Sequence, residues 1–347
     1  MELLYVYLLG RQLKRERTYR DPLDPLHVSD EHLLKYYRMP RQEIITLCQE
    51  LSPHIQRPTR RNHAIPTHTQ VLATLRFLGS KSLQGDIADD TGLTQSTVSR
   101  IVSHVTHVLY DKGRTEVKMP ANDVDINKAT TAFSKISGFP RVIGVVDGTH
   151  IAIKPPENEY NSYVNNKGFT SLNLQVVCNA DQMITGFCVK FPGSAEDEYV
   201  WHVCSMRRRF EAGHFKDTYL LGDRGYPLEP FLMTPFDEPA TEGERQYNTS
   251  HSSTREVMEQ TLQTMKSRFR RIHQSSGALQ YEPIKCAKIA AACMWLHNRC
   301  VQRRIPLPED VEGDTAVEED VDDNEVENED DAPGYETRRD IVEECFP

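Results

Sequence analysis

Two apolar runs that each deliver an aspartate constrain the fold of this 347-residue chain more than any other feature. VIGVVDGTHIAIK carries Asp147, and TYLLGDRGYP carries Asp223. Such β-branched runs indicate buried strands, and the first reads as two strands that meet near Gly148. LNLQVVCNAD and MITGFCVKF predict two more strands. One helical pattern precedes TYLLGD, and further helical patterns come after it. The order of strands, helix, strand and helices predicts an α/β architecture with a mixed sheet.

A third acidic residue, Glu259, lies in the helical pattern STREVMEQTLQTMKSRFR. Ser253 and Glu256 have the spacing of a capping box, which predicts that the helix begins there and gives Glu256 a structural role. Glu259 is left without such a role and lies beside the apolar stripe of the helix. It shares its face with three cations, which are Arg255, Lys266 and Arg270.

Each of the three acids has two interpretations. Asp147 and Asp223 could cap the ends of their strands, and Glu259 could be an ion-paired surface residue. Alternatively, the three carboxylates bind metal. Oxygen-only ligands favour Mg²⁺ or Mn²⁺, and two such ions about 4 Å apart can stabilise both the attacking and the leaving oxygen of a phosphodiester. Arg255, Lys266 and Arg270 would then contact phosphate groups of the nucleic acid.

Residues 84–105 have the pattern of a helix-turn-helix. A small residue, Ala88, lies where a second helix must approach closely, and Gly92 lies in the turn, where glycine most easily adopts a left-handed backbone. The second helix would present its N-terminal side chains to base edges in a major groove. We therefore expect DNA contacts from Gln95, Ser96 and Arg100. The alternative is a plain helical hairpin with polar residues facing solvent.

The charge of the chain is divided unevenly. Its net charge is −10, yet residues 309–347 hold 18 acidic and two basic residues, which leaves 33 acidic and 39 basic residues in the remainder. A mildly basic body suits a polyanionic partner, and an acidic tail with few large apolar residues is expected to be disordered. The eight cysteines form no C-x-x-C pair, which favours a reducing compartment. No membrane association is expected.

The motifs carry a family resemblance. VVDGTHI, FPGSAED, LLGDRGYP and the helix that contains Glu259 occur in an order that resembles PIF/Harbinger superfamily transposases and the Harbinger transposase-derived nucleases of vertebrates. The resemblance covers about residues 30–305. It departs after Glu259, where EQTLQTMKSRF replaces the E-R-x-F-G pattern of many relatives. The resemblance implies a ribonuclease H-like core with an Asp-Asp-Glu triad, formed here by Asp147, Asp223 and Glu259.

The resemblance also implies an activity and its partners. A metal-dependent endonuclease would cleave double-stranded DNA at transposon terminal repeats, and strand transfer would join the 3′-hydroxyl to an A/T-rich target. A Myb-like DNA-binding protein would assist DNA binding and nuclear import, so we expect a nuclear protein that also occurs in the cytoplasm before import. A homo-oligomer is expected as well. The rival hypotheses are a domesticated DNA-binding regulator and a nuclease without transposition activity.

These inferences predict four segments. Residues 1–112 form an all-α DNA-binding domain that contains the helix-turn-helix, and 113–139 form a linker in which INKATTAFSKISG predicts a short helix. Residues 140–305 form the ribonuclease H-like nuclease domain, and 306–347 form the disordered acidic tail. Within the nuclease domain, Ser194 and Asp197 have the spacing of a helix cap, which we favour over a fourth catalytic acid.

Overall fold

The computed structural model describes residues 28–56, 64–308 and 332–346. A five-stranded mixed sheet with the order β3-β2-β1-β4-β5 lies at its centre. The strands are β1 (Val142–Ala152), β2 (Ser171–Cys178), β3 (Ile184–Pro192), β4 (Tyr219–Leu221) and β5 (Leu232–Met233). β1 pairs antiparallel with β2 and parallel with β4. A mixed sheet among many helices confirms the predicted α/β class with a mixed sheet and is consistent with a ribonuclease H-like domain.

The first strand is one continuous element rather than two. β1 runs for 11 residues through Gly148, and it keeps an unbroken register with β2 from Val145 to Ala152. The prediction of two strands meeting at Gly148 is therefore wrong. A glycine in a strand also marks the close approach of another group, and here that group is the carboxylate of Asp197, as described below.

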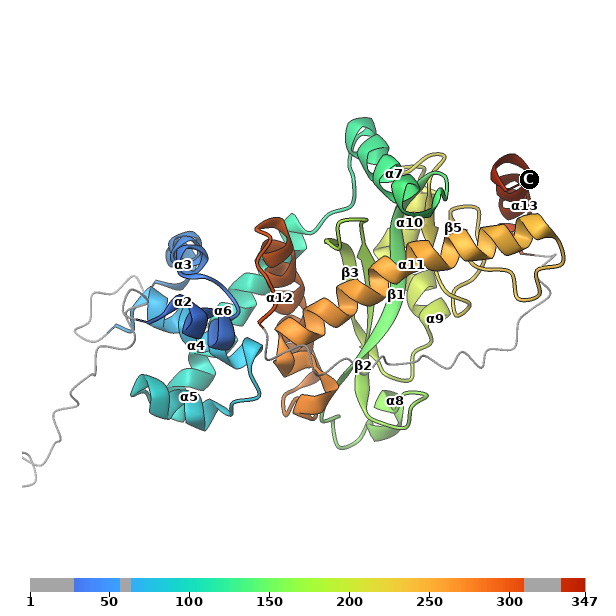
Figure 1. Cartoon of the computed structure of the whole chain (residues 1–347). Coiled ribbons are helices and arrows are strands. Elements are labelled where there is room, and N and C mark those ends of the chain that lie inside the picture. The colour runs from blue at the N-terminus through green and yellow to red at the C-terminus, as the bar shows by residue number, and fades with distance from the viewer. Residues whose placement is uncertain (1–27, 57–63, 309–331, 347) are drawn as a thin grey trace, which may run out of the picture.

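The helices form three groups. The first group is α2 (Asp30–Tyr37), α3 (Arg41–Ile55), α4 (Thr67–Gly79), α5 (Gln84–Thr91) and α6 (Gln95–Glu116). Along the sheet lie α7 (Asp123–Ser137), α8 (Tyr160–Tyr163), α9 (Asp197–Val203) and α10 (Ser205–Glu211). The last group is α11 (Glu242–Arg268), the short η2 (Arg270–Ile272) and η3 (Gln274–Ser276), α12 (Pro283–Gln302) and α13 (Tyr335–Cys345). In Figure 1, α11 crosses the sheet and α12 separates it from the first group.

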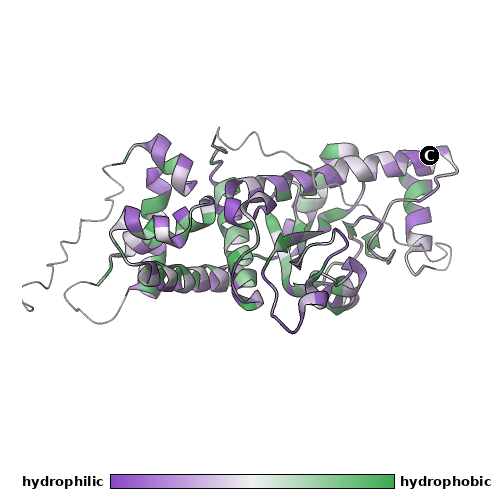
Figure 2. Cartoon of the chain, turned by 90° about the horizontal axis from the view of Figure 1, so that it is seen from below, coloured by the Kyte–Doolittle hydropathy of each residue, from purple (hydrophilic) through white to green (hydrophobic). Residues whose placement is uncertain are grey.

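Two hydrophobic clusters cover the two faces of the sheet. Val145 on β1 belongs to the larger cluster, which includes Met258 of α11 and extends through α12 into α3, α4 and α6. Val146 faces the other way and belongs to the smaller cluster with Trp201 of α9. The strands are accordingly hydrophobic, and the outer helices present hydrophilic surfaces (Figure 2). Asp147 therefore shares the face covered by α11, and Gly148 shares the face covered by α9.

The interval 113–139, expected to be a linker, holds regular structure. α6 continues to Glu116 and α7 occupies 123–137, so only 117–122 lies between them. Phe133 of α7 is fully buried, and the Ser137 hydroxyl donates to the carbonyl oxygen of Ser250 on α11 at 2.8 Å. The short helix predicted from INKATTAFSKISG is therefore present as α7, and most of the interval is packed structure rather than a linker, because the amphipathic pattern of α7 packs into the fold.

The C-terminal segment also departs from expectation. Residues 309–331, which hold the acidic run, lie outside the described residues, but α13 follows at 335–345 and packs against α11. Ile341 is fully buried, and Phe346 contacts the rings of Phe139 and Tyr247. Disorder was the wrong prediction for 335–345, because these residues supply apolar side chains that the acidic run lacks. No described helix is long and apolar enough to cross a membrane.

Candidate active site

Strand register brings Asp147 and Asp223 together. β1 and β4 run parallel with Val145 opposite Leu221, and each aspartate lies two residues beyond its member of that pair. Because side chains alternate with a period of two along a strand, both aspartates are directed to the same face as Val145 and Leu221. Both are buried, with only 5% and 8% of their surface exposed. The predicted pairing of two strand-borne carboxylates is therefore present.

A single guanidinium joins the two carboxylates. Arg255 of α11 places Nη2 3.1 Å from Asp147 Oδ2 and 3.4 Å from Asp223 Oδ2. Burial alone would lower the pKa of Arg255, but the charges of Asp147, Asp223 and Glu259 outweigh it and raise that pKa. The arginine thus remains charged between two buried acids. Arg255 was predicted to contact DNA, and the structure gives it this ion-pairing role, for which the sequence offered no direct signal.

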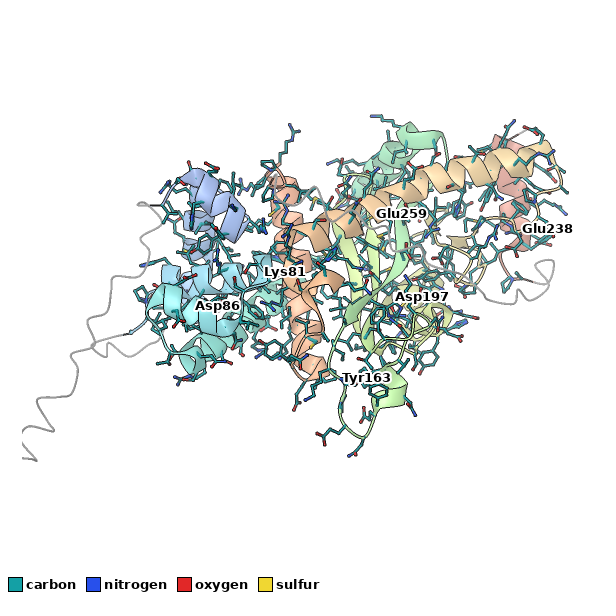
Figure 3. All side chains as sticks on the ribbon, turned by 60° about the horizontal axis from the view of Figure 1, so that its bottom comes forward. Lys81, Asp86, Tyr163, Asp197, Glu238 and Glu259 are labelled. Atoms are coloured by element: carbon teal, nitrogen blue, oxygen red, sulfur yellow. The ribbon has the colours of Figure 1, made fainter. Side chains whose placement is uncertain are left out.

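Glu259 lies one helical turn beyond Arg255 and is exposed on α11 (Figure 3). The predicted helix start near Ser253, on which the choice of Glu259 rested, is wrong. The helix begins at Glu242, where Thr241 and Glu244 form the capping box. Glu256 is therefore a mid-helix residue without a capping role. The feature that now marks Glu259 as a site residue is its proximity to Arg255, because the charge of Glu259 helps to raise the pKa of that guanidinium.

The donor chemistry of the site fits a divalent cation. Asp147 and Asp223 offer oxygen ligands around a point that a cationic nitrogen already occupies. Glu259 does not complete the set in this conformation: no three acidic, histidine or cysteine side chains in the described part of the chain lie close enough together to hold a metal ion. A bound ion would therefore require Arg255 to move aside and Glu259 to turn inward.

Two buried rings support this arrangement. His251, one turn before Arg255, contacts the Met233 carbonyl oxygen through Nε2 at 3.1 Å, and burial lowers its pKa to about 3. Tyr226 is buried, and its pKa is raised by burial and then by the charges of Asp197, Asp223 and Asp147. Its hydroxyl has no hydrogen-bond partner in the described structure. Tyr226 was not among the predicted site residues, although it stands three residues after Asp223.

Asp197 lies on the opposite face of β1 and does not act as the predicted cap. A Cβ on Gly148 would stand 2.2 Å from Asp197 Oδ2, so the glycine makes room for this carboxylate. The Asn173 amide donates to Asp197 Oδ1 at 2.8 Å. Ser194 instead donates to the Ser162 carbonyl oxygen, and Glu196 is the N-cap residue of α9. The capping prediction for Ser194 and Asp197 is therefore wrong.

The predicted DNA-binding side chains fall into two groups. Gln95, Ser96 and Arg100 are exposed at the start of α6, after a turn in which Gly92 has a φ of +67°. Arg100 donates back to its own helix, to the Ser96 carbonyl oxygen at 3.2 Å. In contrast, Lys266 is buried, with 7% exposure, and Arg270 is half-buried after the end of α11. Only the first group forms an accessible polar surface.

Two acidic residues near this surface are engaged within the protein. Asp86 Oδ2 accepts from the backbone N–H of Leu83 at 2.8 Å, and Asp90 pairs with Arg76 at 3.5 Å. Ala88 is buried, as the pattern predicted, and so are Ile87, Val98 and Ile101 of the two helices. The hairpin geometry is thus present, whereas its binding of DNA stays a prediction.

Comparison with known proteins places the chain in a family. Residues 146–298 match the family described as DDE superfamily endonuclease. The human protein named "Putative nuclease HARBI1" is 42% identical over 271 residues, covering 78% of each chain, and its Xenopus laevis counterpart is 36% identical over 280 residues, covering 81% of each. An Arabidopsis thaliana "Protein ALP1-like" is 27% identical over 66% of this chain and 59% of its own. No solved structure matches. This chain belongs to the Harbinger-like family of DDE superfamily endonucleases.

Proposed function

We propose that the protein is a metal-dependent DNA endonuclease whose reaction centre is formed by Asp147, Asp223 and Glu259. The observation that carries this proposal is the convergence of two buried carboxylates on one cation position at adjacent strands, beside a third acid. Mg²⁺ or Mn²⁺ would be held by these three residues, and it would supply electrostatic stabilisation of the charge that develops on the phosphoryl group.

Arg255 has two tasks in this proposal. In the described conformation it bridges Asp147 and Asp223 and weakens the repulsion between these two buried carboxylates. Its side chain is 20% exposed, so it reaches the surface from which DNA would approach. Once it releases the two acids, the guanidinium can donate to a backbone phosphate and orient the DNA.

The exposed start of α6 is proposed as a second DNA contact. Gln95 and Ser96 present polar groups that can bind base edges, and Arg100 presents a cation. The helix pair α5–α6 would then act as a helix-turn-helix that selects DNA ends, while the sheet domain cuts them. Strand transfer, nuclear localisation, a Myb-like partner and self-association belong to this proposal as further expectations from the family resemblance.

A nicking assay tests the proposal. Supercoiled plasmid and linear DNA with candidate terminal repeats are incubated with the protein and Mg²⁺ or Mn²⁺. We expect Asp147→Asn, Asp223→Asn and Glu259→Gln each to reduce cleavage at least 100-fold, a loss typical for removal of one electrostatic catalytic group. Glu256→Gln is the matched control, because Glu256 is an exposed acid on the same helix, and it should cleave like the natural protein. Full cleavage by a variant of one of the three acids would show that this residue is not part of the reaction centre.

The same variants separate binding from chemistry. Because the acids lie away from the start of α6, the triad variants should retain DNA binding in a mobility-shift assay. Arg100→Gln should weaken DNA binding and lower the salt dependence by about one phosphate contact. DNA binding without cleavage or joining by the natural protein would favour a DNA-binding regulator, and cleavage without joining would favour a nuclease that does not transpose.

A further inference from the structure

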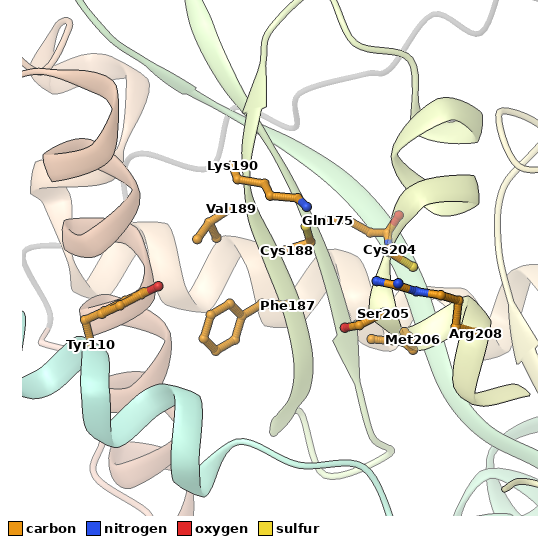
Figure 4. Close-up of a pocket in the computed structure, with 10 residues that line it drawn as sticks. All are labelled: Tyr110, Gln175, Phe187, Cys188, Val189, Lys190, Cys204, Ser205, Met206 and Arg208. Atoms are coloured by element: carbon orange, nitrogen blue, oxygen red, sulfur yellow. The ribbon is translucent and has the colours of Figure 1, made fainter. Parts of the chain in front are cut away.

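A pocket beside the edge strand β3 is not used by this reaction. It has a volume of about 230 Å³ and lies where β2 and β3 meet the start of α10. Cys188, Lys190, Ser205 and Arg208 contribute to its wall, and Gln175 of β2 lies at its inner end (Figure 4). The volume is below the roughly 300–1,000 Å³ of pockets that enclose drug-sized ligands. The pocket therefore suits one small polar group of a ligand, and the rest of that ligand would extend into solvent.

Gln175 is the informative residue of this pocket. Only 1% of its surface is exposed, and neither Nε2 nor Oε1 has a hydrogen-bond partner in the described structure. Its neighbours across the sheet are Gly148 and Cys188, and neither brings a polar side chain other than a thiol. Buried amides are almost always hydrogen-bonded, so an unpartnered one that lines a cavity indicates a ligand.

Two cations beside Gln175 indicate that the ligand is an anion. The charged ends of Lys190 and Arg208 are turned toward the Gln175 amide from β3 and α10 (Figure 4). Both are exposed, and neither forms an ion pair with a described residue. The neighbouring Arg207 differs, because it pairs with Glu211 at 2.7 Å and with Glu229 at 2.8 Å. Burial raises the pKa of the Cys188 thiol, so this lining group stays neutral near pH 7 and does not repel an anion.

We propose that this pocket binds a phosphate group that is either free or the terminal monoester of a larger ligand, with Arg208 and Lys190 balancing its charge and the Gln175 amide donating to a phosphate oxygen. A monoester carries close to two negative charges near neutral pH, which matches two cations, whereas an internal phosphodiester carries one. The Ser205 hydroxyl at the pocket wall adds a further donor.

Two sources offer this chemistry, and the experiment distinguishes them. One is a free phosphate or mononucleotide. The other is the 5′-phosphorylated end of a DNA strand, and only this source rests on the proposed endonuclease function. Calorimetric titrations without divalent metal would use inorganic phosphate, a 5′-phosphorylated trinucleotide and the same trinucleotide with a 5′-hydroxyl. Cleavage cannot occur under these conditions, so the result does not depend on the three acids.

We expect the phosphorylated trinucleotide to bind at least ten-fold more tightly than its hydroxyl counterpart, and Arg208→Gln to remove that preference. Gln175→Met should do the same, and the exposed Arg208 variant keeps the test valid if the buried substitution impairs folding. Lys128→Gln, a charge-matched change on α7, should leave binding unchanged. Inorganic phosphate that competes as well as the trinucleotide would identify the free-phosphate source. Equal affinity for both trinucleotides together with no detectable phosphate binding, or unchanged binding by Arg208→Gln, would overturn the proposal.

Discussion

The two faces of β1 differ in how their buried polar groups are paired, although Asp147 and Gly148, which lie on opposite faces, are consecutive residues. On the α11 face, the buried carboxylate of Asp147 meets a positioned cation, Arg255. On the α9 face, Gly148 accepts the Asp197 carboxylate against its backbone, while the Gln175 amide and the Tyr226 hydroxyl remain without partners in the described structure. The charged groups of the first face pair with one another, although Arg255 Nε has no partner among the described residues, whereas the second face holds a neutral amide and a hydroxyl without partners. The comparison predicts that substitutions on the first face alter stability through charge, and that those on the second act through packing.

The largest effect is expected for Arg255→Met. Removing one partner of a buried ion pair leaves uncompensated charge, so the unfolding free energy should fall by about 3–5 kcal/mol. Arg245→Met is the control on the same helix, because Arg245 is 53% exposed and pairs with the exposed Glu242. That change should cost less than about 1 kcal/mol. Urea unfolding measures both, and equal losses would show that the first face does not depend on its internal cation.

The Arg255 variant also tests the metal site. Mg²⁺ would replace the missing cation between Asp147 and Asp223, so it should raise the melting temperature of Arg255→Met more than that of the natural protein. Thermal unfolding with and without millimolar Mg²⁺ provides the measurement. A larger rise in the natural protein would contradict competition between Arg255 and the metal for one position.

Gly148→Ala is expected to have the next largest effect, on the second face. The added Cβ would approach within 2.2 Å of Asp197 Oδ2 and 2.6 Å of Cγ, so the whole carboxylate must move away and lose its bond from Asn173. Overpacking of this kind costs about 2 kcal/mol. Gly85→Ala is the matched control, since nothing lies within 4 Å of the added Cβ, and its helical position should make it neutral or slightly stabilising. A stable Gly148→Ala protein would mean that Asp197 is not held against this glycine.

The third effect is a pH dependence that belongs to the first face. His251 is neutral when folded, with a pKa of about 3, whereas the unfolded chain takes up a proton below its ordinary pKa of 6.5. The contribution of neutral His251 to the unfolding free energy is therefore complete above pH 6.5 and is lost as the pH falls toward 3. The slope should be about 1 kcal/mol per pH unit below 6.5. His251→Gln, which keeps a donor for the Met233 carbonyl oxygen, should remove this slope in urea unfolding between pH 7 and 4.

A surface histidine controls for the general effect of acid. His107 is half-exposed on α6, and its removal should leave the pH dependence of the natural protein intact. If His251→Gln and the natural protein lose stability in parallel as the pH falls, the neutral buried histidine is not the cause.

The two faces also differ in how far the sequence could predict them. Asp147 and Asp223 were predictable, because apolar runs indicate the two strands and the period of two gives the face on which each side chain lies. Arg255 as their partner was not, because its role depends on the rotation of α11 against the sheet. Ser253 and Glu256 were misleading for a related reason: the capping-box spacing also occurs inside a helix, and only the upstream Thr241 and Glu244 cap this one.

Long-range contacts account for the other differences. Nothing local in FPGSAED reveals that Asp197 meets Gly148, since 49 residues separate them in the chain and the contact forms only when α9 packs on the sheet. The helix at 335–345 was missed because the acidic composition of the whole tail concealed Ile341 and Phe346. Composition averages over a segment, whereas burial of two side chains decides whether part of that segment is ordered.

The smallest expected effect provides the finest comparison between satisfied and unsatisfied buried hydroxyls. Tyr247 donates to the Thr234 carbonyl oxygen at 3.1 Å, so Tyr247→Phe leaves a buried acceptor unpaired and should cost about 1 kcal/mol. Tyr226 has no such partner in the described structure, so Tyr226→Phe removes a buried polar atom without orphaning another and should change stability by less than about 0.5 kcal/mol, or raise it. Urea unfolding of both variants in the same buffer gives the difference. A loss of 1 kcal/mol or more for Tyr226→Phe would show that the Tyr226 hydroxyl is hydrogen-bonded in solution, by water or by one of the three surrounding aspartates. The buried hydroxyl on the second face would then be as well paired as that of Tyr247.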